Sequence, residues 1–193
     1  MKLHTLFATT QTALVKAGVL LAGALALSGP AYAGGDQSAL PNRLSDAKIS
    51  LVEGINRAAQ LEGFPISAKL EMAGPELHMS VYTAKQGRDV AAEKNDLIEL
   101  KGDATKANWT PEKEIFADKP HIARAAMHLT VMQQSGIGLV DLLKKAAPTH
   151  PGTIYSITPD VQNGKPAFRL LTLSDKGKVT ESWLDATGNT IGR

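Results

Sequence analysis

The sequence predicts an α+β fold: two tandem units, each a helix packed on a three-stranded antiparallel sheet, with a helical insert between them. Three observations predict this fold. A helical pattern of apolar residues occurs twice, two strand-like segments around a turn follow each copy, and a third strand then ends in an Asp-Ala-Thr turn. A unit of about 50 to 60 residues buries one thin core that is marginal alone. We therefore expect the two units to pack together.

Residues 1–33 form a predicted secretory signal peptide. They contain two lysines and no acidic residue, an apolar run over 17–27, and the small-residue motif Ala31-Tyr32-Ala33. The run has 11 residues, whereas a membrane-spanning helix needs about 20. We therefore expect cleavage after Ala33, a periplasmic or secreted protein without a stable membrane anchor, and a flexible leader over residues 34–43.

The charges of the chain after the signal peptide cancel. Two of the 21 lysines and arginines lie in the signal peptide and none of the 19 acidic residues does, which leaves 19 of each sign. No basic stripe with interleaved aromatic residues occurs, so we expect no nucleic-acid partner.

Cysteine is absent from the sequence. This excludes disulfide bonds, a thiol nucleophile, a CxxCH haem attachment and a lipidated cysteine at the cleavage site. A small exported domain without disulfide bonds depends on packing alone, which favours regular secondary structure.

The first unit is predicted over residues 44–109. Its helix has one apolar face, and Ser45 or Asp46 is the expected N-cap. Two strands follow around the turn Ala73-Gly74-Pro75-Glu76, and a third ends at Asp103-Ala104-Thr105. The residues expected to form the apolar helix face are Ile49, Val52, Ile55 and Ala59.

The insert is predicted over residues 110–135 as one short and one longer helix. Thr110-Pro111-Glu112 is a typical helix start, with threonine as the cap and proline in the first turn. Pro120 starts the longer helix, whose apolar face is expected to contain Ile122, Ala125, Leu129 and Met132.

The second unit is predicted over residues 136–193. Its helix repeats the apolar spacing of the first, 88 residues later, at Ile137, Val140, Leu143 and Ala147. A hairpin with a turn near 163–166 and a third strand follow, and the strand ends at Asp185-Ala186-Thr187-Gly188.

Residues 137–192 resemble a PepSY domain. The resemblance rests on the helix rich in small residues, on Pro151-Gly152, on the hairpin and on the Asp-Ala-Thr-Gly turn. The first unit departs from the pattern, because Gly63-Phe64-Pro65 replaces Pro-Gly and Lys106 stands where the second unit has Gly188.

The resemblance implies an exported module related to the propeptide region of some secreted metalloproteases, with a role in inhibiting peptidases or binding ligands. It implies no catalytic group. Asp185 and Gly188 carry over only as turn formers, since aspartate bonds local backbone amides and glycine accepts a positive φ.

Candidate ligand-binding residues lie on two predicted strands. His78, Ser80 and Tyr82 share one strand face, with Met79 and Val81 turned toward the helix. This polar face suits a protein or peptide ligand, and ordinary solvent exposure explains the same pattern. Trp183 lies opposite Leu184, where it either packs against the rest of the protein or forms a binding surface.

A metal site is the first alternative. His121, His128 and Met132 lie along one helix, and histidine with methionine is typical of copper sites. Seven residues at about 1.5 Å each separate the two histidines by about 10 Å, so only His128 and Met132 could share an ion. Residues at the boundary of a half-buried helix are the favoured explanation of this pattern, and we expect no cofactor.

Catalytic motifs are absent from the sequence: it has no nucleophile elbow, no HExxH and no Gly-rich phosphate loop before a helix. Asp96 and Glu99 lie in polar sequence with no apolar wall to raise a pKa. We therefore expect a non-enzymatic binding or inhibitory module that modulates an envelope or secreted peptidase. The alternatives are a periplasmic copper-binding or sensing protein and a protein–protein interaction module of the cell envelope.

Overall fold

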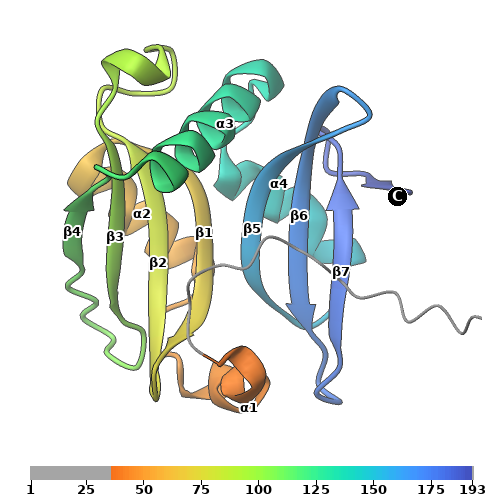
Figure 1. Ribbon diagram of the computed structural model, residues 1–193. Coiled ribbons are helices and arrows are strands. Elements are labelled where there is room, and N and C mark those ends of the chain that lie inside the picture. Colours follow the sequence, from red (N-terminus) through yellow and green to blue (C-terminus); the bar gives the residue numbers. More distant parts are fainter. Residues whose placement is uncertain (1–35, 193) are drawn as a thin grey trace, which may run out of the picture. The chain divides into compact units, whose positions relative to one another are not determined.

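One antiparallel sheet of eight strands organises the computed structural model, which describes residues 36–192 (Figure 1). The strand order is β4-β3-β2-β1-β5-β6-β7-β8. The predicted signal peptide lies outside the described residues. The strands are β1 (Phe64–Ala73), β2 (Glu76–Ala84), β3 (Leu97–Asp103), β4 (Glu112–Ile115), β5 (Thr153–Gln162), β6 (Lys165–Leu173), β7 (Val179–Leu184) and β8 (Thr190–Ile191).

Helices lie on both faces of the sheet. In Figure 1, α2 (Leu51–Glu62) and α4 (Leu139–Ala146) lie behind it and contact each other, while α3 (Lys119–Ser135) crosses its front. The short helix α1 (Leu40–Arg43) lies at one end. The α+β class is confirmed. The two predicted helix-on-three-strand units are not confirmed as such, because β1 pairs with β5 and joins all the strands into one sheet.

Helix α2 begins at a capping box in which Ser50 accepts a hydrogen bond from the Glu53 amide and Glu53 accepts one from the Ser50 amide. The predicted caps were wrong, because Ser45 and Asp46 lie in a preceding 3₁₀ turn, Leu44–Asp46. Ile49 is buried ahead of the helix and Ala59 is exposed. The buried helix residues are Leu51, Gly54, Ile55 and Ala58.

Helix α4 has four buried residues, and each lies 88 residues after one of the four buried residues of α2. The predicted displacement is therefore confirmed, while the predicted face was rotated: Ile137 precedes the helix and Ala147 follows it, exposed. The buried residues of α4 are Leu139, Leu142, Leu143 and Ala146.

The hairpins of the two halves correspond in detail. Strands β5 and β6 have the lengths of β1 and β2 and begin 89 residues later. A register shift occurs near the start of each hairpin, between Pro65 and Ser67 and between Ile154 and Ser156. Ala68 and Ile157, also 89 residues apart, pair with each other at the junction.

The insert differs from its prediction at its start. Residues 112–115 form β4 rather than a short helix, because they pair with the otherwise open edge of β3, as in Leu100 with Lys113. The longer helix is present as α3. Asp118 caps it by accepting a hydrogen bond from the His121 amide.

The leader also differs from its prediction where it is described. Residues 37–46 form consecutive helical turns rather than a flexible segment. The Gln37 amide bonds both the N–H and the C=O of Met72 at the end of β1, and Leu40 and Leu44 are buried. These contacts fix the segment against the first hairpin.

Candidate functional site

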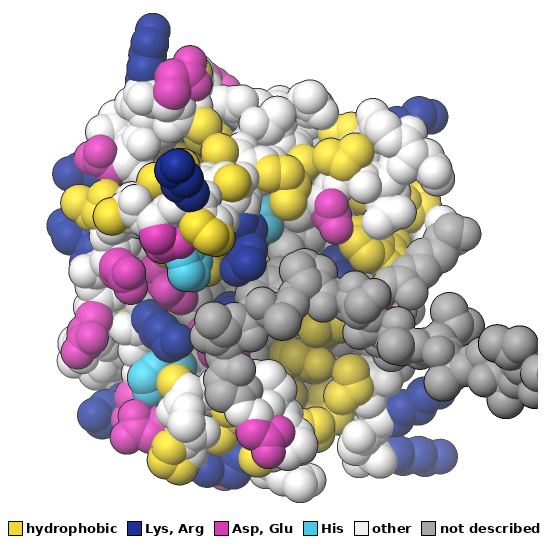
Figure 2. All heavy atoms as spheres, viewed as in Figure 1, with side chains coloured by type: hydrophobic (Ala, Val, Ile, Leu, Met, Phe, Trp, Pro, Cys, Tyr) yellow, Lys and Arg dark blue, Asp and Glu magenta, His cyan; other side chains and the backbone are white. Residues whose placement is uncertain are grey.

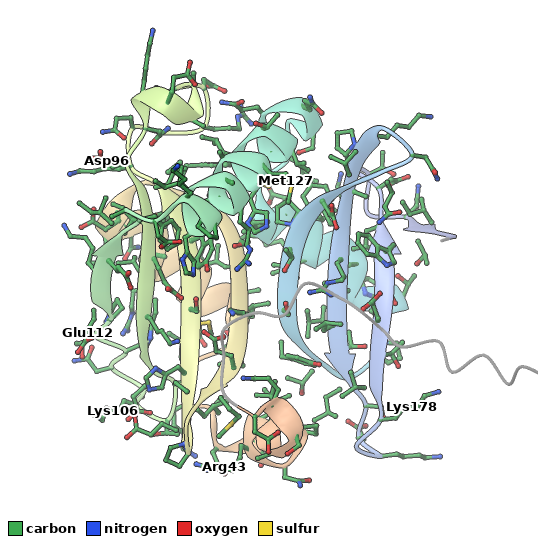
Figure 3. The ribbon with its side chains drawn as sticks, in the orientation of Figure 1. Arg43, Asp96, Lys106, Glu112, Met127 and Lys178 are labelled. Atoms are coloured by element: carbon green, nitrogen blue, oxygen red, sulfur yellow. The ribbon has the colours of Figure 1, made fainter. Side chains whose placement is uncertain are left out.

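The sheet face that carries α3, here called the α3 face, holds charged side chains from several strands, among them Lys69, Glu99 and Arg169. As strand alternation predicts, His78, Ser80 and Tyr82 lie on it, while Met79 lies under α2, where a Cβ on Gly54 would be 3.0 Å from its sulfur. In Figure 3, this face extends between α3, marked by Met127, and the end marked by Arg43.

Two rows of paired residues cross the α3 face. The first runs through Lys101, Ser80, Lys69, Ser156, Leu171 and Glu181. The second, nearer α3, contains Glu99, Tyr82 and Ser67 on one half and Thr158, Arg169 and Trp183 on the other.

Tyr82 is buried rather than exposed. Tyr82 is 5 % exposed to solvent and Ser80 is 1 % exposed. Solvent exposure therefore does not explain this polar strand face. The Tyr82 ring meets Phe116 edge-on at 4.7 Å and lies 6.1 Å from the His128 ring. Burial and the charge of Glu99 raise the pKa of the Tyr82 hydroxyl, which therefore stays protonated.

Glu71 is a buried carboxylate that bridges two lysines. Its oxygens lie 2.5 Å from Lys69 Nζ and 3.2 Å from Lys101 Nζ. Burial opposes its ionisation, but the two ammonium groups outweigh burial and hold the Glu71 pKa below its usual value. On β2, the Ser80 hydroxyl donates a hydrogen bond to Glu99.

His128 lies under α3 and retains 2 % of its exposure, and its Nδ1 has no hydrogen-bond partner. Burial and the charges of Arg124, Arg169 and Lys69 lower its pKa to about 3, so the ring is neutral at physiological pH. Met132 is fully buried one turn along α3.

His121 does not contact the buried pair His128 and Met132. It stacks on Phe116 and bonds Asp118 at 2.6 Å. Across residues 36–192, no group of three or more histidine, aspartate or glutamate side chains could hold a metal ion. His128 and Met132 are buried one turn apart on α3.

Trp183 is buried on the α3 face, with 8 % of its exposure left. Its Nε1 donates to Glu181 at 3.1 Å, and its cross-strand neighbour Arg169 lies 3.8 Å from the same carboxylate. This burial agrees with the packing alternative for Trp183, and its role in a binding surface stays a prediction.

Asp185 and Gly188 form the turn that the sequence predicts. One Asp185 oxygen accepts hydrogen bonds from the amide and hydroxyl of Thr187 and from the amide of Asn189. Asp103 bonds Thr105 in the same way in the first half. Gly188 has φ +90°, and a Cβ there would lie 2.8 Å from the Lys145 side chain, so this glycine also permits close contact with α4.

The basic and acidic residues of the α3 face were missed as site residues. Lys69 and Glu71 alternate with buried apolar residues inside β1, and this interruption of an apolar strand was the available signal. Arg124 and Arg169 come from α3 and β6, and only the fold brings them to the same face.

A hollow of about 390 Å³ opens at the side of this face near β4. His78, Glu99 and Lys101 line it from the sheet, and Glu112 and Lys113 from the edge strand. The α3 face thus combines ionised groups, aromatic rings and a recess, an arrangement that suits non-covalent recognition.

Comparisons with known proteins leave the family of this chain open. No protein-family model and no curated protein matches it. The crystal structure of a Clostridium difficile protein, provisionally described as a lipoprotein, is similar at 12% sequence identity and a TM-score of 0.39, covering 76% of this chain and 92% of that one. Similarity at this level carries no functional argument. Within residues 36–192, no helix has the length and apolar character needed to span a membrane.

Proposed function

We propose that this protein is an exported, non-catalytic binding module of the PepSY type and that the α3 face is its ligand surface. The main observation behind this proposal is Glu71, a buried carboxylate that lies between Lys69 and Lys101 in the middle of a sheet face. Burying charge is costly, and α2 and α4 already provide the apolar core on the other face. A charged face of this kind is best explained by recognition of a ligand.

The tandem arrangement supports the PepSY proposal. The buried positions of α2 and α4 are displaced by 88 residues, the hairpins by 89, and Asp103 and Asp185 make the same turn hydrogen bonds. The proposal assigns one helix and three strands of the shared sheet to each unit, with β4 and β8 as additional edge strands. Export is proposed from the signal-peptide pattern of residues 1–33.

The ligand proposed here is a protein or peptide segment, in the first instance of a secreted or envelope peptidase. The test is the initial rate at which a secreted zinc metalloprotease of the thermolysin type cleaves a fluorogenic peptide. We expect the rate to fall at micromolar concentrations of this protein.

The matched variants remove two positive charges each. Lys69→Gln with Arg169→Gln alters the α3 face, whereas Lys144→Gln with Lys165→Gln alters exposed positions on α4 and at the β5–β6 turn. The first pair should abolish the slowing and the second should keep it. An unchanged protease rate with the parent protein would show that the inhibitory role is wrong.

Two alternatives stay predictions. Copper binding by His128 and Met132 would appear as heat in a calorimetric titration of the protein with copper. Self-association through Trp183 would appear by light scattering as a mass that falls to the monomer value in Trp183→Ala.

A further inference from the structure

The cross-strand pairs of the two halves correspond position by position. Strand β2 pairs with β3 in the register in which β6 pairs with β7, with residues displaced by 89 positions on the first strand and 82 on the second. The corresponding pairs are Tyr82 with Glu99 and Leu171 with Glu181, then Ala84 with Leu97 and Leu173 with Val179. Directly opposed residues share a face of the sheet. Since Tyr82 and Leu171 lie on the α3 face, all of these pairs lie on it.

In the first half, these positions are covered. Tyr82 and Leu97 are each 5 % exposed and Ala84 is fully buried. The Tyr82 ring contacts Phe116 and lies near His128 of α3. The Phe116 amide also donates a hydrogen bond to the Leu97 carbonyl at 3.0 Å, and α3 contacts β3. Helix α3 and the segment that leads to it therefore cover this part of the sheet.

In the second half, the same positions form an open apolar strip, which consists of Leu171, Leu173 and Val179. The two leucines are half-buried and Val179 is 42 % exposed. Figure 2 shows hydrophobic side chains on the lower part of this face. The loop that joins the strands is shorter than in the first half, 174–178 against 85–96, and β8 pairs near the other end of β7. Within residues 36–192, no counterpart of α3 covers the apolar strip.

The charges at the lower end of the apolar strip favour an acidic partner. The turn between β6 and β7 contains Lys176 and Lys178 against one carboxylate, Asp175, and Figure 3 labels Lys178 at this end of β7. Within residues 36–192, neither lysine forms an ion pair. Glu181, beside the apolar strip, already lies 3.8 Å from Arg169. One positive charge thus remains unbalanced at this end.

We propose that the apolar strip is the docking site for an amphipathic helix of a partner protein, which lies on the second half as α3 lies on the first. Acidic residues lie beside the apolar face of this helix. The inference rests on the proposed binding function and specifies its ligand as a helix. Such a helix presents apolar side chains three and four residues apart to a hydrophobic surface. The apolar strip adjoins the surface of α3, because α3 also contacts β6.

Three fluorescein-labelled peptides of about 18 residues, long enough to form a helix, test the proposal by fluorescence anisotropy with the purified protein. The first has leucines three and four residues apart and glutamates on its other side. The second has the same composition with the leucines distributed around the helix, and the third has lysine in place of glutamate. We expect the first peptide to bind at least tenfold more tightly than the second. It should also bind more tightly than the third at low salt, where charge interactions are least screened.

Two valines of similar exposure provide matched variants. Val179 is 42 % exposed in the apolar strip, and Val161 is 46 % exposed at the other end of the β5–β6 hairpin. Val179→Gln should weaken binding of the first peptide by about tenfold, because the apolar contact is lost. Val161→Gln should retain the affinity of the parent protein. Thermal unfolding of both variants separates a lost contact from a lost fold.

Circular dichroism of the complex identifies the occupant. Bound to the protein, the first peptide should gain helical signal. A gain of β signal instead would overturn the proposal in favour of a strand added to β7. A protein that is dimeric by light scattering and becomes monomeric in Val179→Gln would overturn it in favour of a second copy.

Equal affinity for the first and second peptides would overturn recognition of an amphipathic helix, and equal affinity for the first and third would overturn the acidic assignment. Absence of binding by all three at millimolar concentration would also overturn the inference. The proposed function fails separately, if the parent protein leaves the metalloprotease rate unchanged.

Discussion

At the scale of single residues, His128 combines nearly complete burial with three nearby cations. Both factors disfavour the imidazolium form, and they lower the pKa to about 3. In the unfolded chain the same side chain titrates near pH 6.5. The ring therefore adds a pH dependence to the stability of the fold.

We predict that stability falls between pH 7 and pH 5 because of His128. The folded pKa lies below the unfolded one, so in this window the unfolded state binds more protons. The contribution of neutral His128 to the free energy of unfolding is fully present above the unfolded pKa. It is lost as the pH falls, by at most about 1.4 kcal/mol per pH unit. Urea unfolding at pH 7, 6 and 5 measures this slope.

His128→Phe is the matched variant, because it keeps an aromatic ring under α3 and removes the titrating group. Its stability should change less between pH 7 and pH 5 than that of the parent protein. The same slope in both proteins would contradict the assignment to His128.

At the scale of elements, α2 depends on its start. Ser50 and Glu53 form a reciprocal capping box, although the sequence pattern favoured Ser45 or Asp46 as the cap. Ser50→Ala should lower the free energy of unfolding by about 1 kcal/mol, because an amide at the helix start loses its partner. Denaturant unfolding measures the loss.

Ser45→Ala is the control for this prediction. Ser45 is exposed in the preceding 3₁₀ turn, and a surface substitution of this kind changes stability by less than about 0.5 kcal/mol. An equal or larger loss in Ser45→Ala would place the functional cap where the sequence pattern suggested.

The elements also show how far sequence reasoning reaches. Spacing revealed two related helices and two hairpins, because these patterns are local. It misplaced the helix faces by a small rotation, since Leu51 and Leu139 rather than Val52 and Val140 face the sheet fully. It also missed β4, because residues 112–115 become a strand only through pairing with β3.

The candidate site was predictable only in part, for the same reason. His78, Tyr82 and Trp183 could be placed on strand faces by alternation within their own strands. The partners of these residues depend on how distant strands and α3 meet. Arg124, His128 and Arg169 come together through the β1–β5 pairing and the path of α3 across the sheet.

At the scale of the whole molecule, the two halves are continuous. Strands β1 and β5 pair at the centre of the sheet, and α2 packs against α4 on one side of it. Residues 36–192 accordingly belong to one compact unit. A perturbation of one half should therefore reach the other.

The two tryptophans allow each half to be followed separately. Trp109 is buried in the first half and Trp183 in the second, and they are the two tryptophans of the sequence. Trp183→Phe leaves a fluorescence reporter of the first half, and Trp109→Phe leaves a reporter of the second. Each background is then combined with a second substitution on α4.

We predict that Leu142→Ala lowers the unfolding midpoint equally at both reporters. Leu142 is fully buried on α4, and truncating a buried leucine to alanine costs about 2 to 5 kcal/mol. If the halves fold as one unit, the loss appears in full at Trp109 as well as at Trp183. Lys144→Ala, on the exposed side of the same helix, should leave both midpoints unchanged. A midpoint that falls at Trp183 alone would show that the halves unfold independently, despite their shared sheet.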